Sequence, residues 1–511
     1  MTLPTRRRPL LGALLGAGAL LPALRHPARA QAQPGVLRYG LSAFPPNLQP
    51  WVSTGASAGT VKMLIHRSLV SYNSKGELQG EIAESWSREA DGAWVFKLRR
   101  GVLFHNGEEV TAEDVKWTIE QIAGERSTAY MRGQFQAVER IEIPDPQTVR
   151  FVTKEPLVTL PTWFANYNMS IIWRKSPANA PVGAGPFRLT GQERGTSLDL
   201  VRFDRYWKPG HPKLQGIKFI VYADENLRAA ALQSGDVDMI EYVPWQSMDA
   251  VEADPRLKLD AVEGPFMDIL FNGARGPFTD ARVRRAVAHA VKREDIVKAA
   301  FFGRGKPLEG VPIVEGTPWY DAELARGWNY DPARSKALLA EAGVPNGFST
   351  VMLATAQFGM HKDTAEVVQQ HLAAVGIQCE LRLPDWSTRT TMGTNGQYEI
   401  AIHGVSAENN DPDGLTVIMD PSLSPTFSRS FRLSAPRTTA ALARGRAEFD
   451  QAKRVEIYKD MQRAALEEVP LVGLAWRSQG YGFDRKVEGF TNLPGALTTS
   501  SGAMLEYVSI R

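Results

Sequence analysis

The stretch Glu81–Ile122, EIAESWSREADGAWVFKLRRGVLFHNGEEVTAEDVKWTIEQI, combines a strand pattern, a turn and a helix start. Apolar and polar residues alternate in WVFKLRRGVLF, and Asn106-Gly107 then supplies a residue pair typical of a tight hairpin turn. Thr111, with Asp114 three residues later, has the arrangement of a capping box. The residues that follow place three apolar side chains on one helical face: Val115, Ile119 and Ile122. The segment therefore predicts a β-hairpin followed by an amphipathic helix.

The rest of the chain alternates short strand-like runs with amphipathic helices, which indicates an α/β or α+β protein. Val36–Ser42 is an apolar strand pattern, and Asp331–Gly343 has the cap, the first-position proline and the terminal glycine of a complete helix. Residues 364–375 predict a further helix that leads into a strand ending before Trp386. About 480 residues exceed one ordinary core, so we expect two or three lobes.

Residues 1–30 have the layout of an export signal, with cleavage near residue 30 or 32. Basic Arg6–Arg8 precede an apolar run, Leu10–Leu24, and A-x-A sites follow. This run of about 15 residues is shorter than the roughly 20 that cross a bilayer. Arg7-Arg8 also fits a twin-arginine signal, so both the general secretory route and the twin-arginine route stay open. No cysteine lies at the junction for a lipid anchor, and we expect a soluble periplasmic protein.

Charge and cysteine content narrow the classes of function. Five of the 59 basic residues lie in the first 30 positions, which leaves 54 basic against 56 acidic residues in the remainder. Such a balance implies no basic face for nucleic acid. Cys379 is the single cysteine, so an intramolecular disulfide and a zinc site made of thiolates are both excluded. Its apolar neighbours predict a buried small residue.

Motifs of catalysis are missing from the sequence. The eight histidines form no H-E-x-x-H pair, and there is neither a G-x-S-x-G elbow nor a Walker-type loop. We therefore expect no catalytic residue, no metal site and no cofactor. A pair of carboxylates in a secreted glycosidase-like hydrolase remains the alternative from the enzyme class.

The loop Ser406–Gly414, SAENNDPDG, concentrates three carboxylates: Glu408, Asp411 and Asp413. Such a loop could bind calcium, supply a catalytic pair, hold a cationic ligand or form a polar turn. Pro412 interrupts the ligand spacing of a calcium loop, and Met419 stands at the twelfth position, where that loop needs a glutamate. The calcium interpretation is thereby weakened, and the other three remain.

A series of motifs in fixed order carries a resemblance to a known family. Glu81–Ile122 is followed by GAGPFRL, VRFDRYWKPGHPKLQGIKF, ALQSGDVDMI, LFNGARGPFTDARVRRAVAHAVKREDIV, YDPARSKALLAEAG and EEVPLVGL. The chain resembles the extracytoplasmic solute-binding proteins of peptide/nickel-type ABC importers, family 5. The matches cover nearly the whole chain after the signal.

The resemblance implies an α/β, two-lobed periplasmic-binding-protein fold of the three-domain, peptide-binding kind, with a hinge and a cleft between the lobes. Lobe I would comprise 36–265 plus 480–511, with an extra subdomain near 73–181, and lobe II would comprise 266–479. The chain crossings near 264–272 and 476–482 would form the hinge, where glycines permit backbone rotation.

The implied function is capture of a peptide or similar amine-bearing solute and its delivery to the ABC permease subunits of the inner membrane, with the protein acting as a monomer. The alternatives within the class are glutathione, an opine or a nickel chelate. For nickel a histidine must reach the ligand. His403 ends the relevant strand, although strand residues more often face the core.

The family pattern also predicts site residues. Peptide-binding relatives pair the ligand's ammonium with an acidic residue on the loop that here reads SAENNDPDG, and the pattern places Glu408 at that position. Asp411 and Asp413 would orient Glu408 or cap the turn. Relatives fix a short peptide's carboxylate with an arginine where this chain has Lys362. A lysine is a point charge and no bidentate clamp, which argues against a strict dipeptide ligand.

Aromatic residues that follow predicted strands are the expected apolar lining of the cleft, since solute pockets are mostly apolar. The alternative for each of them is packing at a lobe surface. The candidates are Phe44, Trp245, Phe358 and Trp386.

Overall fold

The computed structural model describes residues 34–53, 55–177 and 179–511, so the predicted export signal lies outside the described residues. Within them an eleven-stranded mixed sheet has the order β15-β14-β16-β12-β17-β11-β1-β10-β9-β8, and β13 pairs with β17. The strands are β1 Val36–Leu41, β8 Phe187–Glu193, β9 Ser197–Arg202, β10 Gly216–Val221, β11 Met239–Ile240, β12 Leu257–Phe271, β13 Gly305–Pro307, β14 Phe348–Leu353, β15 Ile377–Arg382, β16 Ile400–Val405 and β17 Val472–Asp484.

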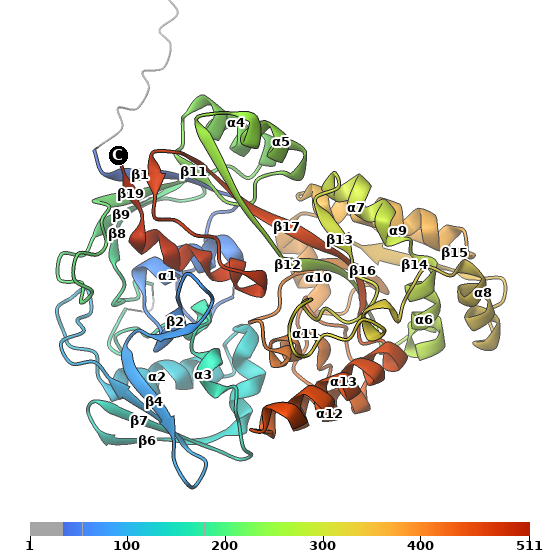
Figure 1. The fold of residues 1–511 in the computed structure, drawn as a ribbon, viewed down its shortest axis with the longest axis horizontal. Coiled ribbons are helices and arrows are strands. Elements are labelled where there is room, and N and C mark those ends of the chain that lie inside the picture. The colour runs from blue at the N-terminus through green and yellow to red at the C-terminus, as the bar shows by residue number, and fades with distance from the viewer. Residues whose placement is uncertain (1–33, 54, 178) are drawn as a thin grey trace, which may run out of the picture. The chain divides into compact units, whose positions relative to one another are not determined.

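The two long strands β12 and β17 lie in the middle of this sheet and pair antiparallel with each other (Figure 1). Their register shifts twice, between Glu263 and Phe266 and between Met267 and Asp268, so two irregular steps interrupt the ladder. Gly264 lies at the first of these steps, and a Cβ added there would come within 2.1 Å of the carbonyl carbon of Gly495. A glycine is required at 264 because the backbone of another segment approaches it so closely.

Helices flank both ends of the sheet. Figure 1 shows α6 to α9 gathered around β14 and β15, and α4 and α5 beside β11. The predicted helix after Asp331 is confirmed, because the Asp331 side chain accepts the N–H of Arg334 at 2.9 Å. The helix predicted over 364–375 begins earlier, at Gly359. The helices are α1 Ala56–Ile65, α4 Glu225–Ser234, α5 Met248–Ala253, α6 Ala281–Ala290, α7 Arg293–Phe301, α8 Pro332–Glu341, α9 Gly359–Ala373, α10 Trp386–Thr394, α11 Thr416–Met419, α12 Pro436–Ala447 and α13 Gln451–Glu468.

The segment 81–122 belongs to a second, four-stranded antiparallel sheet of order β4-β5-β7-β6. The capping box of Thr111 and Asp114 is confirmed. The turn at Asn106-Gly107 is also confirmed, with Gly107 at a φ of 91°. The expected strand pairing was wrong, because β5 pairs with β4 and β7 and the turn closes only one bridge of its own. The elements are β4 Ala83–Arg88, β5 Trp94–Leu98, α2 Ala112–Ala123, β6 Val138–Asp145 and β7 Thr148–Thr153.

Shorter elements complete the fold. They are β2 Val70–Tyr72, β3 Leu78–Gly80, α3 Leu160–Trp163, β18 Val487–Glu488 and β19 Ser509–Ile510, together with 3₁₀ turns at Tyr130–Ala137, Tyr167–Met169, Trp245–Ser247, Pro277–Thr279, Leu324–Arg326, Pro412–Leu415 and Gly495–Tyr507. Cys379 on β15 is buried, as predicted.

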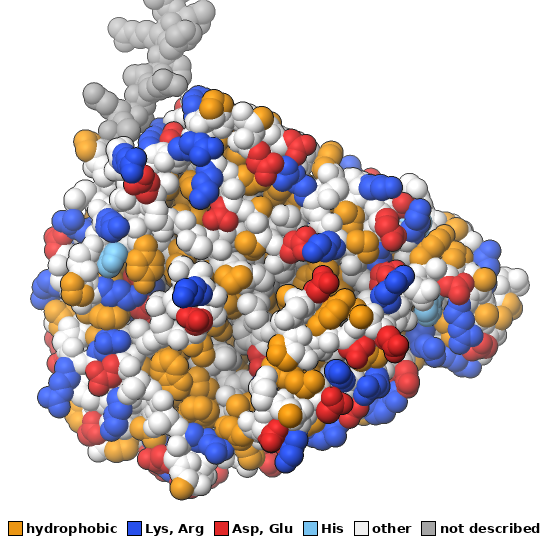
Figure 2. All heavy atoms as spheres, viewed as in Figure 1, with side chains coloured by type: hydrophobic (Ala, Val, Ile, Leu, Met, Phe, Trp, Pro, Cys, Tyr) orange, Lys and Arg blue, Asp and Glu red, His pale blue; other side chains and the backbone are white. Residues whose placement is uncertain are grey.

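The surface carries both signs of charge. On the face drawn in Figure 2, Lys and Arg side chains are interspersed with Asp and Glu, in keeping with the nearly balanced composition. Among the described residues, no helix has both the length and the apolar character needed to cross a membrane.

Candidate functional site

A cavity of about 190 Å³ lies where segments from distant parts of the sequence converge. One set of lining residues precedes β12, a second set lies between β12 and β17, Arg477 comes from β17 itself, and Thr499 follows β17. The first set includes Ser42, Ala43, Gly55, Ala56, Ser57, Asn166, Tyr167 and Tyr242, and the second includes Phe358, Met360, His361, Trp386, residues 403–408, Val417, Ile418, Phe427 and Ser428.

Glu408 lines this cavity, on the loop that follows β16. Its main-chain N–H donates to the carbonyl oxygen of Gly414 at 3.1 Å, and its carboxylate accepts a hydrogen bond from the side-chain amide of Asn166. Burial raises the pKa of Glu408 to about 7, although the Asn166 hydrogen bond acts in the opposite direction. No basic side chain among the described residues forms an ion pair with it. An enclosed carboxylate of this kind is suited to a cationic ligand.

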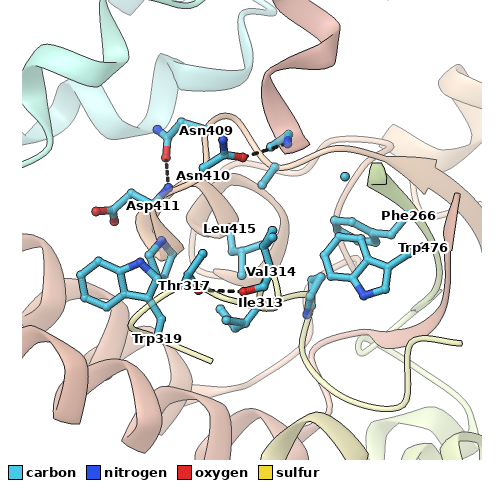
Figure 3. A pocket seen from close by; sticks show the side chains of 15 residues that line it. Phe266, Ile313, Val314, Thr317, Trp319, Asn409, Asn410, Asp411, Leu415 and Trp476 are labelled. Atoms are coloured by element: carbon cyan, nitrogen blue, oxygen red, sulfur yellow. Dashed lines mark hydrogen bonds between the residues drawn. The ribbon is translucent and has the colours of Figure 1, made fainter. Parts of the chain in front are cut away.

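Asp411 belongs to the same loop but has its own cation. Arg454 on α13 donates one hydrogen bond of 2.9 Å to each carboxylate oxygen of Asp411. Figure 3 shows Asp411 at a separate pocket of about 20 Å³, with its carboxylate directed away from Leu415. The ion pair between Asp411 and Arg454 therefore connects the loop to α13.

Asp413 is buried and is likewise satisfied within the protein. It accepts a 2.8 Å hydrogen bond from Arg446 and a 2.9 Å hydrogen bond from the hydroxyl of Thr416, and Thr159 donates a further one. It lies outside the cavity lining. The two aspartates hold the loop in place, and Glu408 is left as the carboxylate of the loop that lines the cavity.

Two of the predicted aromatics form a wall of the cavity. The rings of Phe358 and Trp386 meet edge to face with centroids 5.5 Å apart, and Trp386 meets Phe427 in the same way at 5.7 Å. The ring centroid of His361 lies 5.6 Å from that of Trp386. Trp386 is the first residue of α10, because Asp385 caps a helix at that point.

Three other predicted residues lie outside the lining of this cavity. Trp245 is buried, and its indole N–H donates to the carbonyl oxygen of Ser478 at 2.7 Å. Phe44 packs against the core. Lys362 is exposed on α9 and lies 3.7 Å from Glu366, one helical turn away. Trp245 and Phe44 thus fit the alternative interpretation, in which each aromatic side chain packs against the rest of the protein. The Lys362 side chain faces solvent.

The cavity also contains groups that the sequence did not single out, above all Arg477 and His361. His403 was expected to face the core. It is buried and lines the cavity, with Nδ1 3.1 Å from a carboxylate oxygen of Asp268. Burial lowers the pKa of both histidines well below the ordinary value, so both are neutral near pH 7. The described residues contain no group of three or more His, Cys, Asp or Glu side chains arranged to hold a metal ion.

A larger hollow of about 490 Å³ adjoins the cavity at Phe427. Residues 125–133 and 390–395 form two of its sides, and Glu125 and Arg126 are exposed there. The smaller cavity is the better candidate because it encloses a carboxylate and a guanidinium that have no oppositely charged partner among the described residues.

Comparison with known proteins identifies the family of this chain. Residues 77–423 match the middle region of the bacterial extracellular solute-binding proteins, family 5. The chain therefore belongs to this family. Its proteins are the solute-binding components of ABC importers, and a hydrolase is not favoured.

Individual relatives match this chain over nearly its whole length. The glutathione-binding protein GsiB of Pectobacterium atrosepticum is 27% identical over 90% of this chain and 92% of its own length. The structure of AgaA from A. tumefaciens R10, in complex with agropinic acid, is 37% identical, with a TM-score of 0.90 over 93% of this chain and 99% of its own. DppA of Helicobacter pylori, in complex with a peptide, is 22% identical with a TM-score of 0.83 over 93% and 98%, and supports the periplasmic-binding-protein fold alone.

Proposed function

We propose that this protein captures a small amine-bearing solute in the 190 Å³ cavity, with Glu408 as the partner of the solute's cationic group. It then delivers the solute to its ABC permease from the periplasm, as a monomer and without catalysing a reaction. The observation that carries the proposal is the enclosed Glu408 carboxylate, which has no ion-pair partner among the described residues. In such a site an opposite charge is attracted more strongly than at a surface, because the local dielectric constant is lower.

The sheet supports a division into lobe I, residues 36–265 plus 480–511, and lobe II, residues 266–479. Strands β8 to β11 and β1 lie on one side of the β12 and β17 pair, and β14 to β16 lie on the other. Only β12 and β17 pass from one proposed lobe to the other within the described residues, which suits a hinge. The subdomain near 73–181 contains the four-stranded sheet.

The loop Ser406–Gly414 bridges these proposed lobes. Asn410 donates to the carbonyl oxygen of Pro494 at 3.2 Å and accepts the N–H of Ala496 at 2.9 Å, and Glu408 contacts Asn166. A solute bound at Glu408 therefore lies beside groups from both lobes. Solute contacts with both lobes stabilise the closed arrangement by the difference in affinity between the two states.

The size of the cavity favours a small solute over a long peptide. About 190 Å³ lies below the range of about 300–1,000 Å³ for pockets that take drug-sized ligands. The relatives point the same way: GsiB is a glutathione-binding protein by name, AgaA was solved with agropinic acid, and the 25% identical MoaA was solved with mannopinic acid. An opine-like or glutathione-like solute is the class we propose.

Calorimetric titration tests the role of Glu408. The probes are mannopinic acid, glutathione and the dipeptide Met-Leu, and the variant is Glu408→Gln. We expect the variant to lose about 1.5–3 kcal/mol of binding free energy, the range of a hydrogen bond to a charged group. Glu366→Gln removes an exposed carboxylate on α9 and is the matched control. Equal affinity of the wild type and Glu408→Gln would remove Glu408 from the site.

A further inference from the structure

Arg477 occupies an unusual position for a charged residue. It lies on β17, opposite the register irregularity of β12 between Glu263 and Phe266, and its neighbour across the other edge of the strand is Gly305. The residue is 3% exposed and lines the same cavity as Glu408. A charged guanidinium group is thus buried on the paired strands β12 and β17, beside the solute cavity.

The hydrogen bonding of Arg477 is incomplete. Its Nη1 donates to the side-chain oxygen of Gln479 at 2.7 Å, whereas its Nε is buried without a hydrogen-bond partner. No carboxylate lies within ion-pair distance of it among the described residues. The guanidinium carbon of Arg477 lies over the ring of Trp245, 5.9 Å from the ring centroid.

Other buried arginines of this protein show how such a group is satisfied when its role is structural. Arg293 donates five hydrogen bonds to backbone carbonyl oxygens, at 2.6 to 3.2 Å, although its Nη2 is also buried without a hydrogen-bond partner. Arg284 donates four, again to backbone carbonyls. Neither of them lines the cavity. Arg477 lacks such a set of acceptors, so structural hydrogen bonding does not account for it.

The surroundings of Arg477 are electrostatically suited to an anion. Burial lowers the pKa of Arg477, which reflects the cost of holding its charge away from water. Its charge adds to burial in lowering the pKa of His361 and His403, and both of these line the cavity as neutral rings. The Arg477 charge therefore stands beside the cavity with no carboxylate of the described residues within ion-pair distance of it.

We propose that Arg477 binds a carboxylate group of the captured solute, so that the cavity takes a small zwitterion held by Glu408 through its ammonium and by Arg477 through its carboxylate. The planar guanidinium offers a fork of donors that matches the two oxygens of a carboxylate. This inference rests on the proposed function and adds the second recognised group. It also assigns to Arg477 the part that, by the resemblance, an arginine plays in relatives at the position of Lys362.

Titration of variants tests the assignment. The probes are mannopinic acid, glutathione and Met-Leu, which each carry an amine and a carboxylate, and the compound that binds the wild type most tightly is carried forward. Arg477→Met should bind it about 10- to 100-fold more weakly, the effect expected for a lost charge-assisted pair. Lys362→Met removes an exposed positive charge outside the cavity and should leave the affinity unchanged. Should Met-Leu be the compound carried forward, its C-terminal amide should bind the wild type and Arg477→Met equally weakly.

Stability without solute separates a binding role from a structural one. Arg477→Met should melt at the wild-type temperature or above it, because replacing a buried, unpaired charge with an apolar side chain removes a desolvation cost. A structural arginine would show a clear fall. If Arg477→Met does not fold, Arg477→Lys carries the test. It keeps the charge without the fork and should also bind more weakly than the wild type.

The outcomes distinguish a failure of the Arg477 assignment from a failure of the proposed solute-binding function. A probe that binds the wild type and Arg477→Met equally, while Glu408→Gln weakens it, overturns the role of Arg477 and leaves the capture of an amine-bearing solute standing. Failure of all three probes to bind the wild type overturns both, since the panel covers opine, glutathione and peptide chemistry.

Discussion

Solute affinity should rise as the pH rises through about 7, because Glu408 must be ionised to bind an ammonium group. Its pKa in the solute-free protein is raised to about 7 by burial. From pH 5.5 to pH 7.5 the ionised fraction of a group with this pKa rises from about 3% to about 76%. If the ammonium lowers the pKa of Glu408 below 5.5 in the complex, the association constant rises about 25-fold over this range.

The experiment is calorimetric titration with the best-binding amine probe at pH 5.5, 6.5 and 7.5. A peptide α-ammonium has a pKa of about 7.7–8.0, so about 25–40% of it is deprotonated at pH 7.5, and the rise expected for a peptide probe is about 15- to 19-fold. Near pH 7 the titration should release about half a proton per solute, read from the dependence of the heat on the buffer. His361 and His403 do not contribute, because burial holds the pKa of both well below this range. A pH-independent affinity, or the same pH dependence in Glu408→Gln, would refute the reasoning.

The same pKa shift affects the stability of the solute-free protein. Between the ordinary value of 4.5 and about 7, the folded state binds more protons at Glu408 than the unfolded state does. Stability contributed by this group therefore falls as the pH rises through that window. The difference in unfolding free energy between wild type and Glu408→Gln, followed from pH 4.5 to 7, should show this trend.

Two further predictions concern the loop Ser406–Gly414 and the paired strands β12 and β17. Asp413→Asn should lower the free energy of unfolding by about 3–5 kcal/mol in denaturant titrations, because it leaves the Arg446 guanidinium without its charge partner. A stability equal to that of the wild type would contradict the view that Asp413 fixes the loop. Gly264→Ala should destabilise the protein by about 1–3 kcal/mol, since its Cβ would lie 2.1 Å from the backbone of Gly495. A stable Gly264→Ala variant would show that residue 495 moves away easily.

Local features of the fold were predictable from neighbouring residues. The capping box of Thr111 and Asp114 and the cap of Asp331 depend on contacts within three residues, so the pattern itself specifies them. The pairing of β5 was not predictable in this way. Its partners are β4 and β7, and β7 lies some fifty residues further along the chain.

The same holds for the candidate site: features that depend on local sequence were predictable, and those that depend on long-range contacts were not. The family pattern singled out Glu408, but the roles of its neighbours depend on arginines that lie 33 and 43 residues away in sequence, at Arg446 and Arg454. Arg477 was missed because nothing in its local sequence indicates that it is buried. Its position beside the cavity follows from the pairing of β12 with β17. This pairing brings together segments from distant parts of the chain.

Mass spectrometry of the solute that leaves the protein on denaturation tests the central claim most directly. The protein is purified in its native state from cells that export it, and the released compound is identified by its mass and fragmentation. We expect a small molecule that carries both an amino group and a carboxylate, with less of it retained by Glu408→Gln and by Arg477→Met. A long peptide, or a solute that has neither group, would contradict the account.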